Sequence, residues 1–301
     1  MVGLDLRIRP GQVTGLLGLN GAGKTTTIKM LSTLLLPTSG KATVDGLDLV
    51  RDAHAIRRVI NMVAGGERMV YWRLTGRENL WYFAQLYDIP RDGLSRRIDA
   101  LLRLVGLQDA AEIAVERYSK GMKQRLQLAR GLINEPRYLF LDEPTIGLDA
   151  PIAREMRRMV SRMAAEGRGV LLTSHYLQEV DELCSHVYLI HRGQLIAEGS
   201  PAELKALAGQ ERSVSVLISE LPDPVASALR GLAAETGAGL ETGATAEGIR
   251  VTLRHRDDLS GRVASTVALS GIPIIRLESL EPTLEHAVMA LTEKASNDAH
   301  G

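Results

Sequence analysis

A glycine-rich segment near the start of the chain has the residue types and the spacing that bind phosphate. It reads Gly18-Leu19-Asn20-Gly21-Ala22-Gly23-Lys24-Thr25-Thr26. Glycines let the backbone curl so that successive N–H groups point at phosphate oxygens, and no Cβ blocks the approach. Lys24 would supply a mobile ammonium for the terminal phosphates, and Thr25 a hydroxyl for Mg²⁺. The segment therefore predicts a phosphate-binding loop.

Two carboxylates and a histidine follow other apolar runs. Asp142 and Glu143 come directly after the apolar residues 138–141, and His175 follows the run 169–173 with one serine between. Such runs are typical of strands buried on both faces of a parallel sheet, which binds ligands at the carboxyl ends of its strands. We therefore expect these three side chains on the same rim as the phosphate-binding loop. The other histidines lack the spacing of a metal site, and we assign no metal to His54, His186, His191, His255, His286 or His300.

The hydrophobic pattern predicts the elements that position these side chains. A strand over 13–17 leads into the phosphate-binding loop, and a helix from Lys24, expected to end before Pro37, follows it. The start of that helix would add the positive end of its dipole, about half an elementary charge, to the phosphate site. The pattern also predicts an edge strand within 1–9, a hairpin over 42–47, a helix over 53–58 and a strand over 59–64.

The stretch 71–87 holds six of the eleven aromatic residues of the chain. Thr75 and Glu78 have the spacing of a capping box, which predicts a helix from Gly76. Phe83 and Tyr87 fit the packing stripe of that helix. Tyr71 and Trp72 precede it in a loop, where large apolar groups suit a partner surface. Further helices are predicted over 94–105, 120–133 and 150–165.

A hairpin over 183–190 and 194–197 and a helix from Pro201 to about Gly209 lead into a tail with a different pattern. Strands at 214–218, 249–253 and 272–277 would alternate there with helices over 224–234 and 257–269. This order is similar to a split β-α-β-β-α-β unit, and a last helix begins near Leu284. The tail contains no group of residues typical of catalysis. Subunit pairing, regulation, ligand sensing and inert packing all remain open for it.

Length, charge and cysteine content limit the class of protein. The 301 residues suffice for one large domain or two ordinary ones. Lys and Arg number 36 and Asp and Glu also number 36, so no overall field recruits nucleic acid, and we expect no nucleic-acid partner. The single cysteine, Cys184, excludes an intramolecular disulfide, fits a reducing cytoplasm and has the spacing of a buried helical residue. No apolar stretch reaches the ~18 residues that span a bilayer, and residues 1–9 contain no signal-peptide core, so any membrane-spanning part would belong to another chain.

With Glu143 and His175 added to the phosphate-binding loop, residues 2 to about 209 resemble the nucleotide-binding subunit of an ATP-binding cassette (ABC) transporter. The most specific element is Tyr118-Ser119-Lys120-Gly121-Met122-Lys123-Gln124. It is similar to the signature loop of that family, in the variant of drug- and antibiotic-exporter ATPases of the daunorubicin-resistance type. Residues 144–149 resemble the D-loop region, and Ser174-His175 resembles the switch histidine.

The resemblance implies an α/β fold, a P-loop NTPase cassette with a RecA-like core, a small antiparallel β part and a helical subdomain at about 70–135. This nucleotide-binding domain would span 1–209, and a small α+β accessory domain for pairing or regulation would span 210–301. Two copies would pair head to tail, with each ATP between the phosphate-binding loop of one copy and the signature loop of the other.

The resemblance also implies the role of each residue. Thr25 and Asp142 would hold Mg²⁺, Glu143 would polarise the attacking water, and His175 would contact the γ-phosphate together with Lys24. Ser119 and the backbone of Gly121 would donate to the γ-phosphate across the interface, and Asp149 would couple the two sites. The implied ATP contacts are Gly18, Asn20, Gly21, Ala22, Gly23, Lys24, Thr25, Thr26, Ser119, Gly121 and Asp149.

The sequence departs from the family pattern at two places. Members usually carry a glutamine after the strand here at 59–64, whereas this chain has Gly65-Gly66-Glu67-Arg68. Either Glu67 or water takes the place of the glutamine, or coupling to the membrane partner is altered. The family also stacks adenine on an aromatic residue from a strand that precedes the one at Val2, and this sequence starts too late to contain that residue. The difference suggests a shortened or misassigned start, or looser base recognition. Stacking contributes only ~1 kcal/mol beyond area burial, so ATP binding would weaken and not vanish.

These features predict the ATP-hydrolysing subunit of an exporter, driving a separate membrane permease for drugs, antibiotics or lipids. It would lie in the cytoplasm, on the inner face of a bacterial membrane. The alternative is a soluble ABC ATPase of translation, DNA repair or cofactor assembly. Translation members usually carry two cassettes and repair members a long coiled coil, and this sequence has neither. A non-hydrolysing regulatory module is disfavoured because Lys24, Asp142, Glu143 and His175 are all in place.

Overall fold

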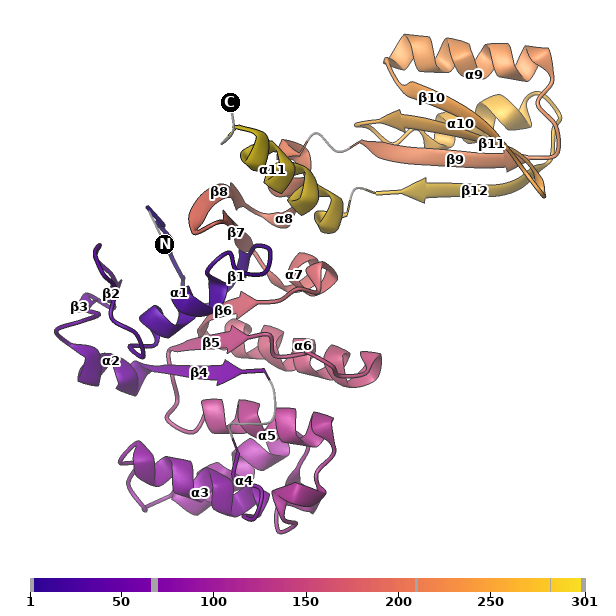
Figure 1. The fold of residues 1–301 in the computed structure, drawn as a ribbon. Coiled ribbons are helices and arrows are strands. Elements are labelled where there is room, and N and C mark those ends of the chain that lie inside the picture. Colours follow the sequence, from indigo (N-terminus) through magenta and orange to yellow (C-terminus); the bar gives the residue numbers. More distant parts are fainter. Residues whose placement is uncertain (1–2, 66–69, 209–210, 282, 299–301) are drawn as a thin grey trace. The chain divides into compact units, whose positions relative to one another are not determined.

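The computed structural model describes residues 3–65, 70–208, 211–281 and 283–298 (Figure 1). It divides into two compact units, one containing the residues up to Ala202 together with those from Thr292 onward, the other Glu203–Leu291. Each unit has its own hydrophobic core. Every helix within the described ranges is too short or too polar to cross a membrane.

A six-stranded sheet organises the larger unit. Five strands run parallel, and the last is antiparallel to its neighbour. The apolar runs of the sequence form the predicted strands because both faces of the sheet are covered, and every residue of the strands 13–17 and 169–173 is buried. The spatial order is β4 (Ile60–Ala64), β5 (Tyr138–Asp142), β6 (Gly169–Thr173), β1 (Val13–Leu17), β7 (His186–His191) and β8 (Gln194–Gly199).

The carboxyl ends of three parallel strands are in register at one edge of this sheet. Ala64 of β4 pairs with Asp142 of β5, and Asp142 pairs with Thr173 of β6. Just beyond the strands, the Gly65 N–H donates to the Asp142 carbonyl at 2.6 Å, and the Glu143 N–H donates to the Thr173 carbonyl at 3.1 Å. Because β1 lies next to β6, the loops after β1, β5 and β6 all open on the same edge, as the sequence predicted.

Helices α6 (Ala150–Ala165) and α7 (Leu177–Leu183) follow β5 and β6. Helix α6 forms as predicted, and Asp149 caps it, since its side chain accepts from the Ile152 N–H at 3.0 Å. At Gly15 of β1, an added Cβ would lie 3.1 Å from the Sγ of Cys184, so α7 and the residue after it pack closely on the sheet. Cys184 is buried, as predicted, and burial raises the pKa of its thiol.

A helical region stands beside the edge strand β4 (Figure 1). It contains α3 (Gly76–Leu86), α4 (Leu94–Leu104), η2 (Gln108–Ala110), η3 (Val115–Arg117) and α5 (Lys120–Gly131) around a core of its own. The predicted capping box is present, because the Glu78 N–H donates to the Thr75 hydroxyl at 3.2 Å and the Thr75 N–H donates to the Glu78 carboxylate at 2.8 Å. Phe83 and Tyr87 pack against this core, as predicted.

The short elements between β1 and β4 match the sequence, although the helix that follows β1 is short. The hairpin of β2 (Thr43–Val44) and β3 (Leu47–Asp48) and helix α2 (Ala53–Val59) form as expected. Helix α1 (Lys24–Leu31) ends well before Pro37, because Thr33 has a φ of 59° and leaves the helical region. The apolar periodicity continues past this point without a helix.

Two expectations in the larger unit are wrong. Described residues 3–9 form no strand, although Leu4, Leu6 and Ile8 do pack against the core. The Arg7 N–H donates to the side-chain hydroxyl of Tyr188 in β7 at 3.0 Å, and not to a backbone carbonyl as in a sheet. The expected hairpin from 183 begins later, because Leu183 is the last residue of α7 and β7 starts at His186.

The smaller unit has the predicted β-α-β-β-α-β order. Its four strands are antiparallel in the order β10-β11-β9-β12, and α9 and α10 supply part of its core. The sequence missed β10, because this edge strand is mostly exposed and carries little apolar alternation. The elements are β9 (Arg212–Ile218), α9 (Asp223–Thr236), β10 (Gly239–Thr245), β11 (Gly248–His255), α10 (Ser260–Ala268) and β12 (Ile274–Leu280), with α8 (Pro201–Leu207) and α11 (Leu284–Asp298) at the ends.

The core of the helical region predicts a stability difference between two leucines of α3. Leu80 is fully buried in that core, whereas Leu86 is 60% exposed. Replacing Leu80 by alanine removes buried methyl groups and leaves a cavity, so we expect Leu80→Ala to lower the free energy of unfolding by about 2–5 kcal/mol. Leu86→Ala should change it by less than about 0.5 kcal/mol. Denaturant titration followed by circular dichroism measures both, and equal losses would contradict this packing.

Candidate nucleotide-binding site

The loop between β1 and α1 has a backbone that only glycine adopts readily at three positions. Gly18, Gly21 and Gly23 have φ values of 156°, 81° and 107°. At Gly18 an added Cβ would lie 2.3 Å from the Ile190 carbonyl oxygen, so the close approach of this loop to β7 also excludes a side chain. The glycine spacing noted in the sequence therefore corresponds to a real requirement of the loop.

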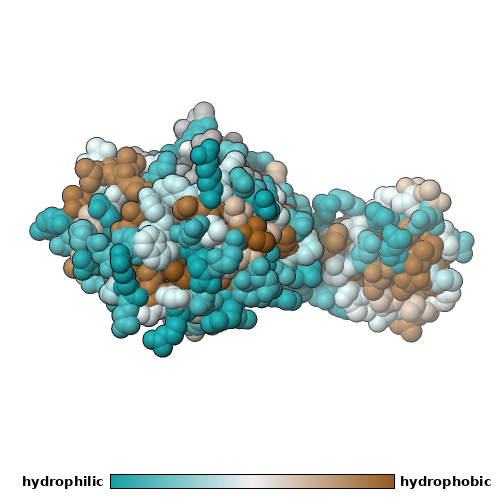
Figure 2. Space-filling model, turned by 90° about the horizontal axis from the view of Figure 1, so that it is seen from below, coloured by the Kyte–Doolittle hydropathy of each residue, from teal (hydrophilic) through white to brown (hydrophobic). Residues whose placement is uncertain are grey.

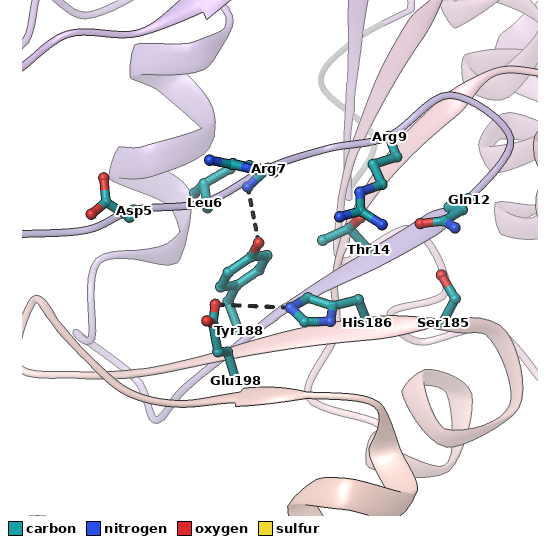
Figure 3. A pocket seen from close by; sticks show the side chains of 10 residues that line it. All are labelled: Asp5, Leu6, Arg7, Arg9, Gln12, Thr14, Ser185, His186, Tyr188 and Glu198. Atoms are coloured by element: carbon teal, nitrogen blue, oxygen red, sulfur yellow. Dashed lines mark hydrogen bonds and ion pairs between the residues drawn. The ribbon is translucent and has the colours of Figure 1, made fainter.

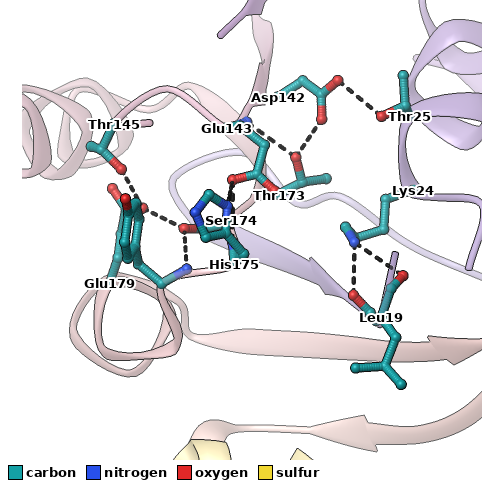
Figure 4. Close-up of polar contacts among 12 residues, drawn as sticks. Leu19, Lys24, Thr25, Asp142, Glu143, Thr145, Thr173, Ser174, His175 and Glu179 are labelled. Atoms are coloured by element: carbon teal, nitrogen blue, oxygen red, sulfur yellow. Dashed lines mark hydrogen bonds and ion pairs between the residues drawn. The ribbon is translucent and has the colours of Figure 1, made fainter. Parts of the chain in front are cut away.

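The lysine of this loop lies back across it. The Lys24 ammonium donates to the Gly18 carbonyl at 2.7 Å and to the Leu19 carbonyl at 3.3 Å (Figure 4). Helix α1 begins at this same residue, and its N-cap residue Gly23 provides no side chain to satisfy the first amides. A cation and the unsatisfied N–H groups at a helix start thus meet in one loop, which fits a polyphosphate.

Asp142 connects the phosphate-binding loop to the sheet. Its Oδ2 accepts from the Thr25 hydroxyl at 3.2 Å, and its Oδ1 accepts from the Thr173 hydroxyl at 2.6 Å (Figure 4). Thr173 thereby fixes the carboxylate so that it faces Thr25. One carboxylate and one hydroxyl fit Mg²⁺, which takes few protein oxygens when phosphates supply others. The sequence predicted Asp142 and Thr25 here but missed Thr173, whose hydroxyl no spacing pattern distinguishes.

Glu143 has an unusual backbone for a residue with a side chain. Its φ is 55°, a conformation that costs on the order of 1–3 kcal/mol and persists where the surroundings impose it. The Glu143 N–H donates to both oxygens of Thr173, which holds the turn. Its Oε2 accepts from the His175 N–H at 3.2 Å and lies 2.5 Å from the His175 Nδ1. The structure thus brings Glu143 and His175 together beside Asp142, on the rim predicted from the sequence.

A third carboxylate lies close to Glu143 and His175, and the sequence did not single it out. Glu179, in the first turn of α7, is 1% exposed, and its Oε2 accepts from the Ser174 hydroxyl at 2.7 Å and from the Thr145 hydroxyl at 2.9 Å. Burial raises the pKa of Glu179. It was missed because Leu177, Val180 and Cys184 set the apolar stripe of the helix and Glu179 lies outside that spacing. No pattern in the sequence identifies such a contact.

The signature segment forms the start of α5. Tyr118 is buried and donates to the Ala110 carbonyl at 2.6 Å, while the exposed Ser119 caps the helix by accepting from the Met122 N–H at 3.2 Å. At Gly121 an added Cβ would lie 2.6 Å from the side chain of Ile152, so a glycine allows α5 to approach the start of α6. Ser119 therefore lies at the start of α5 in the helical region, whereas the phosphate-binding loop lies between β1 and α1 of the sheet region.

The segment in place of the expected glutamine is only partly described. Gly65 is described, and an added Cβ there would lie 2.5 Å from the Glu143 carbonyl oxygen, which explains the glycine at this position. Gly66, Glu67 and Arg68 lie outside the described residues. A role for Glu67 near Mg²⁺ stays a prediction.

A separate polar cavity of about 600 Å³ lies at the opposite end of the strands, where β1 and β7 begin (Figure 3). Acidic and basic side chains both line it, and His186 Nε2 lies 3.9 Å from a Glu198 oxygen. The cavity contains none of the residues predicted to bind phosphate. The Thr25, Asp142 and Glu143 side chains at the carboxyl edge, and not this cavity, have the chemistry of a nucleotide site.

A parallel sheet with a glycine-rich phosphate-binding loop after one strand and an acidic pair after another defines the class of P-loop nucleoside triphosphatases. Comparison of the chain with known proteins identifies its family within this class. The family described as ABC transporter matches residues 1–146. Daunorubicin resistance ATP-binding protein DrrA3 of Streptomyces coeruleorubidus is 40% identical over 290 residues, 96% of this chain and 90% of that protein. ABC transporter ATP-binding protein NatA of Bacillus subtilis is 40% identical over 210 residues, 70% of this chain and 84% of NatA.

Solved structures agree with these relatives. CbiO1 from Clostridium perfringens, described as part of the ABC transporter complex cbiONQ, aligns with a TM-score of 0.63 at 28% identity and covers 68% of this chain and 83% of its own. The chain belongs to the ATP-binding proteins of ABC transporters, the family that binds and hydrolyses ATP to power transport through a membrane permease. The family resemblance and the cassette fold predicted from the sequence are confirmed.

Proposed function

We propose that this chain is the motor subunit of an exporter that removes a drug or antibiotic from the cell. Relatives that match nearly the whole chain support this proposal. Besides DrrA3, the linearmycin resistance ATP-binding protein LnrL of Bacillus subtilis is 29% identical over 98% of this chain and 94% of LnrL. The two names refer to resistance against daunorubicin and against linearmycin. A soluble ATPase of translation, repair or cofactor assembly has no comparable support.

The contact between Glu143 and His175 is the single observation that carries the hydrolytic part of the proposal. A carboxylate held in a strained turn, and oriented by a histidine at 2.5 Å, is suited to accept a proton from the water that attacks the γ-phosphate. Lys24 and the start of α1 would neutralise phosphate charge. Thr25 and Asp142 would hold Mg²⁺, which offsets charge on the β- and γ-phosphates when bound.

A second copy of the chain would complete each site. The exposed Ser119 and the first amides of α5 form a helix start with no acidic residue in its first turn, which suits the γ-phosphate bound to another copy. Asp149, exposed at the start of α6, would contact the opposite site. ATP would thereby join two copies, and hydrolysis would release them.

The permease would dock on the aromatic surface of the helical region. Tyr71, Trp72 and Trp81 are each close to half exposed, far more than is usual for such large side chains. Trp72 is held in place because the ammonium of Lys123 lies 4.8 Å from its ring centre. Docking there would keep the chain on the cytoplasmic face of the cell membrane.

We propose that residues 1–209 form the nucleotide-binding domain. The tail, residues 210–301, would form an accessory domain that serves pairing or regulation, and the match to DrrA3 along 96% of the chain supports this division.

The role of Glu143 is tested by Glu143→Gln. The amide keeps the shape of the side chain but loses most of its basicity, so we expect turnover to fall by at least about 100-fold while ATP binding remains. The variant should accumulate as a dimer with Mg-ATP, measured by light scattering after gel filtration. Glu182→Gln, an exposed carboxylate on α7, is the control and should hydrolyse ATP like the wild type. Unchanged turnover in Glu143→Gln would refute the role.

Docking of the permease is tested at Trp72. Removing this half-exposed ring should weaken a hot spot of the interface, so Trp72→Ala should reduce co-purification with the co-expressed neighbouring permease by roughly ten-fold. ATP hydrolysis by the isolated chain should stay within about two-fold of wild type, because Trp72 lies in the helical region, whereas Thr25, Asp142 and Glu143 lie at the carboxyl edge of the sheet. Leu269→Ala, an exposed apolar residue of the smaller unit, is the control. If wild-type chain never sediments with membranes that contain the permease, the exporter proposal is wrong.

A further inference from the structure

Glu179 makes contacts that the proposed mechanism does not use. Its side chain is 1% exposed, and one carboxylate oxygen accepts from two hydroxyls, those of Thr145 and Ser174. The three residues come from three different segments: the loop after β5, the end of β6 and helix α7. Figure 4 shows Thr145 and Ser174 converging on the Glu179 carboxylate.

Each hydroxyl belongs to a segment that leads to a proposed functional residue. Thr145 lies between Glu143 and Asp149, in the loop that would reach a second copy. Ser174 directly precedes His175, and its Oγ accepts from the Tyr176 N–H at 3.0 Å. The Glu179 N–H donates to the Tyr176 carbonyl at 2.9 Å, so residues 174–176 turn around the carboxylate.

The location of Glu179 makes these hydrogen bonds strong constraints. A buried carboxylate has lost its water, so each protein donor contributes more than it would at the surface, and a lost donor is not replaced. Burial raises the pKa of Glu179, whereas the two hydroxyl donors lower it. Because both hydroxyls donate to the same Glu179 oxygen, Oε2, this atom holds Thr145 and Ser174 close to each other.

We propose that Glu179 is a positioning residue that couples the loop 143–149 to His175. It holds Thr145 and Ser174 at one distance, so a shift of this loop at the interface between two copies moves His175 relative to Glu143. This inference rests on the proposed ATPase function and deepens it, because it assigns a connection between the dimer interface and the hydrolytic pair. Glu179 itself contacts neither nucleotide nor water in this scheme.

The test removes the Thr145 hydroxyl donor and keeps the volume of the side chain. Thr145→Val deletes the hydroxyl, and Thr145→Ser keeps it. In the purified full chain, Thr145→Val should lower kcat for ATP hydrolysis by about ten-fold through misplacement of His175. The Kd for a fluorescent ATP analogue should stay within about two-fold, because the deleted Thr145 hydroxyl donates to Glu179 and not to the phosphate-binding loop. The ring signals of His175 in a histidine-labelled NMR sample should shift in the same variant.

Two further variants make the result specific. Thr145→Ser should restore kcat to within about two-fold of wild type, which a loss of packing would not allow. Glu182→Gln is the matched control on the same helix, where the carboxylate lies 2.9 Å from Arg157 Nε at the surface, and should leave kcat and the His175 signals unchanged.

Four outcomes would overturn the inference. These are an unchanged kcat in Thr145→Val, a loss that Thr145→Ser does not restore, unmoved His175 signals, and a parallel loss of ATP affinity and Tm that marks general destabilisation. Failure of the proposed function looks different, because Glu143→Gln would then retain turnover. If Glu143→Gln is inactive while Thr145→Val matches wild type, the ATPase proposal stands and only the role of Glu179 is wrong.

Discussion

The site depends on the register of three parallel strands. Ala64, Asp142 and Thr173 lie in one row at the carboxyl edge of the sheet, and β1 lies next to the last of these strands. A slip of one residue in β5 would turn Asp142 to the opposite face and break its contacts with Thr25 and Thr173. The apolar interiors of these strands fix the register through burial, so the packing of the sheet determines where the carboxylates lie.

This edge combines three unusual features, of which the strained Glu143 backbone and the buried Glu179 carboxyl group are unfavourable in isolation. Three loop glycines adopt positive φ, Glu143 does the same with a side chain, and Glu179 is buried with a carboxyl group. Hydroxyl groups offset the cost, because Thr173, Thr145 and Ser174 all donate to the buried carboxylates. Ser119 lies at the start of α5 in the helical region, whereas the phosphate-binding loop lies between β1 and α1.

Much of this arrangement was predictable from the sequence because its causes are local. Apolar runs identified the buried strands, and the glycine spacing reported a backbone need that the φ values confirm. Other features depend on contacts between distant segments. The early end of α1 at Leu31 follows from the positive φ of Thr33, β10 is an exposed edge strand without an apolar pattern, and Glu179 meets Thr145 only through folding. Hydroxyl partners carry no periodic signal, which is why Thr173 was also missed.

We propose that a complete ATP site contains the phosphate-binding loop of one copy and the signature serine of another. Mixing two inactive variants, Lys24→Ala and Ser119→Arg, tests it most directly, because a mixed dimer would contain one site with both parts intact. We expect each variant alone to be inactive and an equal mixture to recover about a quarter of wild-type ATPase activity, since half of the dimers would be mixed and each would hold one intact site of two. A mixture that forms mixed dimers yet stays inactive, or a Ser119→Arg chain that hydrolyses ATP like the wild type, would contradict it.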